Sequence, residues 1–293
     1  MPELPEVETV KRGLNKRIVG KVIADVTYDW PKSFPNNKAD ITNFLIGARV
    51  KGISRRGKAI IITLSSGYAL VVHLKMTGQL VYVSVKSNDR FGAGHPTDSL
   101  VAALPDTSTR VTLRFSDESK LYFNDQRKFG WMRLVPRQLV DELPFFQLLG
   151  PEPLDDTFNE SDFQKRFARR QNSMIKAALL NQSTIAGVGN IYADEALWGA
   201  KIHPRSRVRM LHANELNTLF TELRDILQKA IASGGSTDKN YVSADGKKGS
   251  YLQIARVFRR DGQPCYRCGN TIEKIRVAGR GTHMCSVCQK ERP

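Results

Sequence analysis

Cysteine is scarce in this sequence, with only four in 293 residues, so no spare thiol needs a separate explanation. Long apolar segments are absent as well: no run of about eighteen apolar residues occurs, so the sequence predicts no transmembrane helix. The first residues are acidic and polar rather than basic and then apolar, which argues against a secretory leader. Internal repeats and low-complexity tracts are also missing. The length therefore predicts about two globular domains, with room for an appendage.

The four cysteines form two Cys-x-x-Cys knuckles, Cys265 with Cys268 and Cys285 with Cys288, separated by sixteen residues. This spacing is typical of tetrahedral zinc coordination by thiolates. A pair of disulfides is the alternative, and the missing secretory leader disfavours it. Four thiolates would fill every coordination position, so we predict one structural Zn²⁺ ion rather than a catalytic one.

Acidic residues are few: 29 Asp and Glu face 45 Lys and Arg, which gives a formal net charge of +16. Residues 239–293 contain twelve Lys and Arg and four Asp and Glu, a net charge of +8 around the predicted zinc ribbon. Such concentrated positive charge favours a nucleic-acid backbone as the partner. An acidic membrane surface is a weaker alternative, because no basic amphipathic helix with an apolar face stands out.

Two kinds of periodicity divide the chain. Ala59–Leu64 and 69–74 are rich in β-branched residues and predict strands, and 111–115 with 121–123 predicts a hairpin. Apolar residues recur every three or four positions from 158 to 233, which predicts helices. The fold class is therefore α+β, and the expected domains are a β-sandwich at 1–134, a linker at 135–153, a helical domain at 154–235, and a loop with a zinc ribbon at 236–293.

Pro2 follows the initiator methionine and would become a free secondary amine once Met1 is removed. An N-terminal amine has a pKa of about 7.7–8.0, so part of it is unprotonated and nucleophilic at neutral pH. Attack on an aldehyde-level carbon would give an iminium ion, which is an electron sink for breaking neighbouring bonds. The simpler alternative is a helix start with Glu3 and Glu6 near its positive end, and the two interpretations are compatible.

Five motifs carry a resemblance to a known family: Pro2–Glu6, Arg55–Lys58, Asp125–Gly130, Gly187–Glu195 and Ala278–His283. In this order, and together with the knuckles, they resemble the bacterial formamidopyrimidine-DNA glycosylases, which excise oxidised purines such as 8-oxoguanine. The resemblance spans almost the whole chain. Two alternatives remain, an endonuclease VIII-like glycosylase for oxidised pyrimidines and a non-catalytic zinc-ribbon nucleic-acid-binding protein. Leu4 favours the purine enzymes over the first.

The resemblance implies a bifunctional glycosylase and lyase with four catalytic residues. Pro2 would attack the anomeric carbon, expel the base and leave a Schiff base, and two eliminations would then cut the strand on both sides. Glu3 would move protons at the sugar, with Glu6 in support. Lys58, expected to project from the rim of a sheet, and Arg280, expected at the tip of the ribbon hairpin, would bind phosphates and assist cleavage.

The same resemblance implies a set of DNA contacts. Met76, Arg127 and Phe129 would fill the gap left by a flipped nucleotide, although core packing is the usual alternative for Met and Phe. Asn190 would contact phosphate at a helix start, or would only cap that helix. His73 and Arg170, with Arg166 and Arg169, are further phosphate candidates, and residues 241–250 fall where the family has a loop over the lesion.

Two departures from the family pattern concern one region. The stretch 83–109 is longer than usual and, with its glycines and prolines, predicts an exposed excursion. Ser108 and Arg110 replace an expected pair of histidines, so Arg110 becomes the candidate phosphate contact there. Overall the sequence predicts a monomeric cytoplasmic protein whose partner is double-stranded DNA with an oxidised base or an abasic site.

Overall fold

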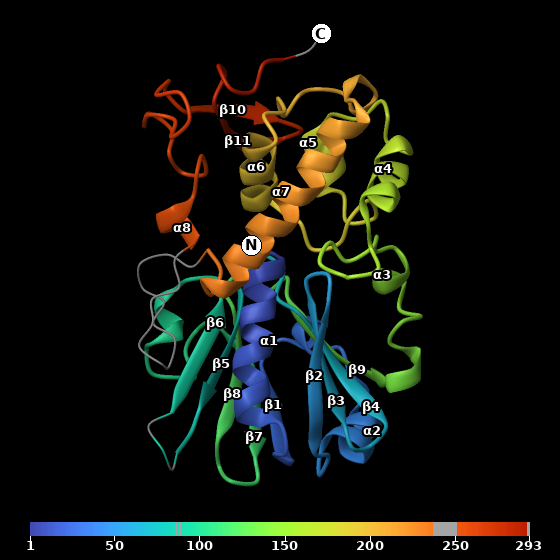
Figure 1. Ribbon diagram of the computed structural model, residues 1–293. Coiled ribbons are helices and arrows are strands. Elements are labelled where there is room, and N and C mark those ends of the chain that lie inside the picture. The colour runs from blue at the N-terminus through green and yellow to red at the C-terminus, as the bar shows by residue number, and fades with distance from the viewer. Residues whose placement is uncertain (86, 88, 237–250, 292–293) are drawn as a thin grey trace. The chain divides into compact units, whose positions relative to one another are not determined.

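The computed structural model describes residues 1–85, 87, 89–236 and 251–291. The chain divides into two compact units, Met1–Gln147 with residues 234–236, and Leu148–Ser233 with residues 251–291. Figure 1 shows the strands of the first unit and the helices and small hairpin of the second. Among the described residues, no helix has the length and apolar character that crossing a membrane requires.

The first unit is built from two antiparallel sheets and one long helix. The five-stranded sheet has the order β1-β7-β8-β5-β6, with β1 at Ile23–Tyr28, β5 at Gly78–Val83, β6 at Arg90–Gly94, β7 at Thr109–Phe115 and β8 at Lys120–Asp125. The four-stranded sheet has the order β2-β3-β4-β9, with β2 at Val50–Arg56, β3 at Ala59–Leu64, β4 at Tyr68–His73 and β9 at Trp131–Pro136. Buried side chains from both sheets and from helix α1 (Leu4–Ile18) form one core.

The local patterns explain these elements. Val7, Val10 and Leu14 recur at three- and four-residue spacing on α1 and are fully buried, as expected for the apolar face of an amphipathic helix. The runs at β3 and β4 are buried on both faces, which suits their unbroken β-branched composition. The strand predictions at 59–64, 69–74 and the 111–123 hairpin are confirmed to within a few residues.

The excursion expected at 83–109 is wrong in one respect. Arg90–Gly94 forms strand β6, which pairs with β5 and carries the buried side chains Phe91 and Ala93. The Arg90 guanidinium donates hydrogen bonds to the carbonyls of Ser99, Leu100 and Ala102, so it holds the following turn against the strand. Glycines and prolines suggested a loop here, but Phe91 gains more by burial against α1.

The second unit contains four longer helices, which are α4 (Glu160–Ala168), α5 (Ile175–Leu180), α6 (Asn190–Gly199) and α7 (Ala213–Ala232). Residues Tyr192–Gly199 of α6 are buried on every side, so this helix is the centre of the unit. The unit also holds the two-stranded sheet of β10 (Glu273–Val277) and β11 (Arg280–Met284). The predicted α+β class, with a sandwich, a helical domain and a ribbon, is confirmed.

The remaining helical turns are short. They are η1 (Pro31–Ser33), α2 (Lys38–Asp40), η2 (Ile41–Leu45), η3 (Asp98–Leu100), η4 (Arg137–Leu139), α3 (Pro144–Gln147), η5 (Val208–Met210) and α8 (Tyr251–Ile254).

Candidate active site and zinc centre

The expected site residues fall into two groups, one in each unit. In the first unit, Pro2 and Glu3 are buried directly in front of α1, and Glu3 is the N-cap of that helix. The backbone N–H of Glu3 donates to Oε2 of Glu6 at 2.8 Å, as in a capping box. Pro2 therefore precedes a helix start whose backbone is pinned, which fixes the position of its nitrogen.

Glu6 makes a second contact that sequence reasoning missed. Its Oε1 accepts a hydrogen bond of 2.7 Å from the backbone N–H of Ser236. Gly235 has a φ of +88°, and a Cβ there would lie 2.9 Å from the same Oε1, so only glycine suits this position. The Glu6 carboxylate thus connects the start of the chain to Gly235 and Ser236. Nothing in the local sequence signals a pairing 230 residues apart.

Lys58 lies in the turn directly before β3, after Gly57 at a φ of 57°. Its side chain is only 6% exposed, and the expectation that its ammonium projects from the sheet rim stays a prediction. His73 pairs with Ala59, the neighbour of Lys58, across β3 and β4. The lysine charge therefore acts on the imidazole at close range.

His73 is a buried, neutral histidine. Burial, with the charges of Lys75 and Lys58, lowers its pKa to about 3. Its Nδ1 accepts a hydrogen bond of 3.0 Å from the backbone N–H of Lys75, and its ring lies against Trp131 and Phe145. Contact with a phosphate, which stays a prediction, would be a neutral hydrogen bond rather than an ion pair.

The depressed pKa of His73 predicts acid sensitivity. Between the unfolded pKa of 6.5 and the folded pKa of about 3, the unfolded chain binds the proton and the folded chain does not, so stability falls as pH falls. The loss from this group should reach about 1.6 kcal/mol between pH 6.5 and 5. Denaturant unfolding of wild type and of His73→Gln at pH 6.5 and at pH 5 would measure the loss of stability. The variant should lose less stability than wild type, by about the amount assigned to His73. An equal loss in both proteins would contradict the assignment.

Hydrogen bonds connect the two turns that hold Met76, Arg127 and Phe129, the residues expected to fill the gap left by a flipped nucleotide. Met76 is half-buried in the turn between β4 and β5, and Arg127 and Phe129 are exposed in the turn after β8. The Thr77 hydroxyl donates to the Asp125 carboxylate and accepts from the backbone N–H of Arg127. The core-packing alternative is wrong for Phe129, which is 53% exposed beneath the Arg127 guanidinium.

Arg110 does not have the surroundings of a phosphate ligand. Its side chain is 5% exposed. The guanidinium donates to the Asp125 carbonyl at 3.0 Å, to the Asp29 carboxylate and to the Thr107 carbonyl. With its donors used inside the unit, Arg110 holds β1, β7 and β8 together. This geometry favours a structural role over the expected DNA contact.

In the second unit, the start of α6 lies against the ribbon hairpin. Gly189 is the N-cap and Asn190 the first helical residue, so the alternative that Asn190 caps the helix is wrong. Its Nδ2 instead donates to the Gly281 carbonyl at 2.9 Å. Arg280, the neighbour of Gly281, is exposed at the start of β11, directly after a turn in which Ala278 and Gly279 have φ values of 48° and 76°. The expected hairpin-tip position is present.

A buried ion pair supports this hairpin, and no local sequence pattern indicated it. Lys176 Nζ lies 2.6 Å from Asp194 Oδ1, and both side chains are fully buried. The same ammonium donates to the Thr282 hydroxyl at 2.6 Å and to the Gly281 carbonyl at 3.2 Å. Asp194 also accepts the backbone N–H of His283 at 2.9 Å. Helices α5 and α6 thereby fix the strand that begins with Arg280.

Glu195 is a second buried anchor on α6. Its carboxylate accepts backbone N–H groups from Arg256, Val257 and Phe258 at 2.8–2.9 Å, and the Tyr251 hydroxyl at 3.1 Å. Burial, followed by the charge of Glu195, raises the pKa of that tyrosine far above its usual range. The chain from 251 onward is therefore firmly attached to the helical core.

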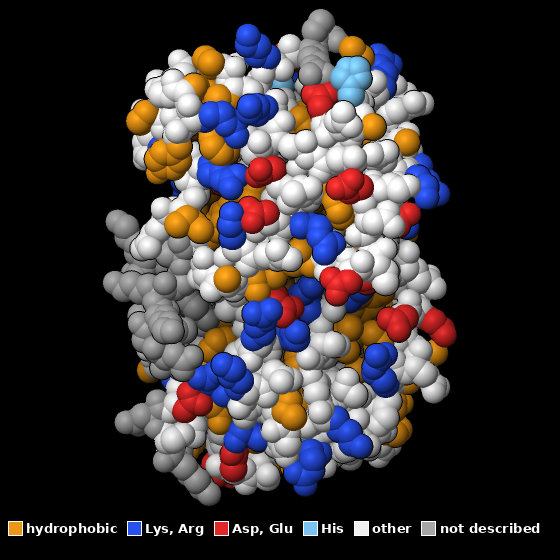
Figure 2. Space-filling view, viewed as in Figure 1, with side chains coloured by type: hydrophobic (Ala, Val, Ile, Leu, Met, Phe, Trp, Pro, Cys, Tyr) orange, Lys and Arg blue, Asp and Glu red, His pale blue; other side chains and the backbone are white. Residues whose placement is uncertain are grey.

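Arg170 is exposed, as a phosphate ligand requires, and its guanidinium donates to the Ser183 hydroxyl at 2.9 Å. Arg169 is exposed beside it, and Arg166 is half-buried on α4. Figure 2 shows Lys and Arg side chains on the visible face of both units, with acidic side chains between them. The proposed loop at 241–250 lies outside the described residues.

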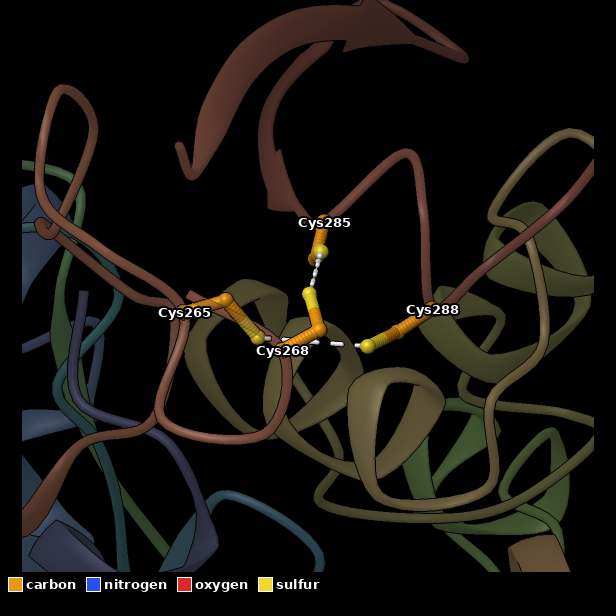
Figure 3. Close-up of side chains that lie close together, drawn as sticks. All are labelled: Cys265, Cys268, Cys285 and Cys288. Carbon is orange, nitrogen blue, oxygen red and sulfur yellow. Dashed lines mark hydrogen bonds between the residues drawn. The ribbon is translucent and has the colours of Figure 1, made fainter. Parts of the chain in front are cut away.

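The four cysteines converge on one point, as Figure 3 shows. Cys265 and Cys288 have their sulfur atoms 3.9 Å apart, Cys268 and Cys285 have theirs 3.5 Å apart, and all four lie within 4.8 Å of one another. A tetrahedron with Zn–S bonds of about 2.3 Å places its sulfur atoms about 3.8 Å apart. The geometry fits zinc, and the disulfide alternative is wrong because all four thiols are free.

Groups around the cysteines connect the zinc centre to α6. The indole N–H of Trp198 and the backbone N–H of Arg267 each point to Cys265 Sγ at 3.4 Å. The Arg267 guanidinium stacks on the Trp198 ring and donates to the carbonyls of Trp198 and Gly199. Donors of this kind stabilise thiolate ligands and orient them.

Comparison with known families gives this geometry a context. Residues 1–132 match the family model of the formamidopyrimidine-DNA glycosylase N-terminal domain, and residues 149–241 match that of the formamidopyrimidine-DNA glycosylase H2TH domain. Residues 262–290 match a zinc finger found in FPG and IleRS. The chain belongs to the formamidopyrimidine-DNA glycosylase family.

Relatives of this glycosylase family match the chain over its full length. The formamidopyrimidine-DNA glycosylase of Herpetosiphon aurantiacus is 42% identical, over 99% of this chain and all of the relative. The Lactococcus lactis glycosylase in complex with abasic-site DNA is 36% identical, with a TM-score of 0.86 over 99% of this chain and all of that one. A MutM structure with carbocyclic 8-oxo-G DNA has 36% identity and a TM-score of 0.85 over the same shares. The predicted enzyme class and the structural zinc ion are confirmed.

Proposed function

We propose that this glycosylase excises oxidised purines, 8-oxoguanine and formamidopyrimidines, from double-stranded DNA and then cleaves the strand through an N-terminal proline Schiff base. The observation that carries the proposal is the pinned start of the chain. Pro2 precedes a helix N-cap whose amide is bound by Glu6, so its amine would be held in one place once Met1 is removed. A fixed nucleophile avoids much of the entropic cost of a bimolecular attack.

In the first step, the Pro2 nitrogen forms a bond to the anomeric carbon, and the electron pair of the glycosidic bond leaves with the base. Opening of the sugar ring then gives an iminium ion, and the ring oxygen takes a proton. Glu3 is adjacent in sequence and buried beside the proline, where a carboxyl group can donate a proton to the sugar. We assign the proton transfer to Glu3.

In the later steps, the iminium ion accepts electrons while protons are lost from the sugar and the two phosphates depart by β- and δ-elimination. Departing phosphates carry negative charge, which Lys58 and Arg280 would stabilise. The exposure of Arg280 at a hairpin tip suits a phosphate contact. The guanidinium fork binds phosphate in a bidentate manner that lysine lacks.

Exposure supports part of the proposed DNA contacts. Arg127 and Phe129 protrude from one turn, and Met76 lies in the adjacent turn. We propose that these three side chains fill the space of the flipped nucleotide, with Arg127 facing the unpaired base. Asn190, Arg170 and the buried His73 would contact the DNA backbone.

The solved relatives in complex with abasic and 8-oxo-G DNA support this choice of partner. The curated relatives come from bacteria, where DNA lies in the cytoplasm, and we propose that this chain acts there as a monomer.

Borohydride trapping tests the proposal. Purified protein, shown by mass spectrometry to begin at Pro2, would be trapped on duplexes with 8-oxoguanine opposite cytosine, an abasic site or an oxidised pyrimidine, and the adduct mapped by peptide analysis. We expect an adduct on Pro2 with the first two duplexes. An adduct with the oxidised pyrimidine and not 8-oxoguanine would favour the endonuclease VIII-like alternative. No adduct on any duplex would leave only a DNA-binding protein.

Removal of zinc should weaken DNA binding. Without the metal the two knuckles lose their connection, so the hairpin is attached only through its contacts with α5 and α6, and the charge-assisted contact of Arg280 should be weakened or lost. Such a contact is worth about 1.5–3 kcal/mol, or about 10- to 150-fold in affinity. Fluorescence anisotropy on abasic-analogue DNA after chelation, with the zinc content measured, would check this. Full affinity in a sample verified as zinc-free would contradict it.

A further inference from the structure

His95 lies in the stretch where this chain departs from the family pattern, and the two elements around it fix its position. Helix α1 and strand β6 run side by side (Figure 1). The Arg17 guanidinium bonds to Asp89 at 3.1 Å and stacks on Phe91. A Cβ added to Gly13 would lie 1.9 Å from the Phe91 ring, so helix and strand are in direct contact there.

Beyond the contact between Gly13 and Phe91, α1 and β6 both continue toward the N-terminal end of the helix. From Gly13 back to Leu4, α1 advances nine residues, or about 13 Å at about 1.5 Å per residue. From Phe91 to Gly94 the strand advances three residues, or about 10 Å at about 3.3 Å per residue, and His95 follows its last residue. Because Arg17 contacts Asp89 and Gly13 contacts Phe91, β6 runs toward the N-terminal end of α1, and His95 follows the end of β6 nearest to that helix start.

The backbone, rather than the imidazole, secures His95. Its N–H donates to the Gly78 carbonyl at 3.0 Å, and its carbonyl accepts from the Gln79 side-chain amide. Gly94, with a φ of +129°, permits this approach, because a Cβ there would lie 2.4 Å from the Gly78 carbonyl oxygen. The half-buried ring itself makes no hydrogen bond to any residue that the structure describes. A firmly held residue thus presents an uncommitted imidazole.

Electrostatics agrees with this placement. Burial lowers the pKa of His95, the positive charge of the terminal amine, which Met1 carries in this structure, lowers it further, and the Asp125 carboxylate opposes both. These are the charged groups that act on the ring, one from the segment before α1 and one from the end of β8. Strand β5 contributes Gly78 and Gln79, which carry no charge. The imidazole is therefore neutral at neutral pH and within electrostatic range of the N-terminus.

We propose that His95 is the base that removes the proton from the Pro2 amine as it attacks the sugar, directly or through one water molecule. The inference rests on the proposed function of Pro2. The amine lone pair forms the bond to the anomeric carbon, the glycosidic electron pair leaves with the base, and the N–H proton moves to the imidazole. Glu3 remains the donor to the ring oxygen, so the two proton transfers have separate partners.

The test compares wild type, His95→Gln and His95→Ala with Asp98→Asn, an exposed residue of the same stretch. Single-turnover base release from 8-oxoguanine DNA is measured from pH 4 to 8. A base of this kind contributes about 10²-fold or more, so both His95 variants should be slower by that factor at neutral pH. Asp98→Asn and the affinity of all proteins for abasic-analogue DNA should stay within about twofold of wild type.

The pH profile separates a proton-transfer role from a structural one. Wild type needs both a neutral amine and a neutral imidazole, so below the pKa of His95 the logarithm of the rate should fall with a slope of two. The His95 variants should keep a slope of one, and added imidazole should restore the rate of His95→Ala in proportion to its concentration. Wild-type rates, an unchanged slope or absent rescue would overturn the proposal. If wild type itself forms no adduct on Pro2, the proposed function is wrong, and the role of His95 is wrong with it.

Discussion

Replacement of Pro2 by glycine is expected to slow base release and strand cleavage together by about 100-fold or more, while the affinity for abasic-site DNA changes little. Glycine keeps a terminal amine but removes the ring that fixes the backbone at this position. The pinned segment between Pro2 and α1 would then hold its nitrogen less well, and a misplacement of about 1 Å is enough for an effect of this size. Single-turnover kinetics and borohydride trapping would measure both steps.

Pro5→Ala is a matched control, because Pro5 is a second proline of the same segment and lies inside the first turn of α1. Its replacement leaves the terminal amine, Glu3 and Glu6 in place, so the chemistry should be unaffected. If Pro2→Gly turned over at the wild-type rate, the nucleophile assignment would be wrong. If both variants were equally slow, the effect would belong to the helix start rather than to the amine.

Replacement of Lys176 by methionine is expected to lower the free energy of unfolding by about 3–5 kcal/mol. The side chain is fully buried, and its loss would leave the Asp194 charge inside the core without its cation. It would also remove the donor to Thr282 and Gly281, beside Arg280. Denaturant unfolding would measure the stability, and DNA binding would report whether the hairpin is displaced.

Two comparisons make this prediction specific. Lys229 and Asp225 on α7 form an exposed pair at 2.7 Å, with side chains 54% and 42% exposed, and Lys229→Met should cost less than about 1 kcal/mol. The double variant Lys176→Met with Asp194→Leu should recover part of the loss, because no charge is left buried. A small effect of Lys176→Met alone would mean that water reaches the pair.

Much of the fold followed from local patterns. The strands at 59–64 and 69–74 were predictable because β-branched residues fill them and Ser65–Gly67 separates them. Helix α7 was predictable from Leu216, Leu223 and Ile231 at helical spacing. Strand β6 was missed because its five residues include two glycines, and its stability comes from pairing with β5 and from the contact of Phe91 with α1.

The candidate site residues also divide into those that local motifs indicated and those whose surroundings depended on packing. Contiguous motifs indicated Pro2, Glu3 and Arg280, and the roles assigned to them stay predictions. The burial of Lys58 and of Arg110 was not visible, because exposure depends on what the rest of the chain places over a residue. Glu6 with Ser236, and Lys176 with Asp194, join positions that nothing in the local sequence relates.

The sequence by itself determined the family, the α+β class and the zinc ligands, because each is written in short motifs whose chemistry depends on spacing along the chain. Only the tertiary structure decided which charges are buried, which turns are connected by hydrogen bonds and which strand packs against α1. Those features depend on close contacts between distant residues. The burial and the pKa of a side chain follow from the surroundings that packing creates, and these surroundings exist only once the chain has folded.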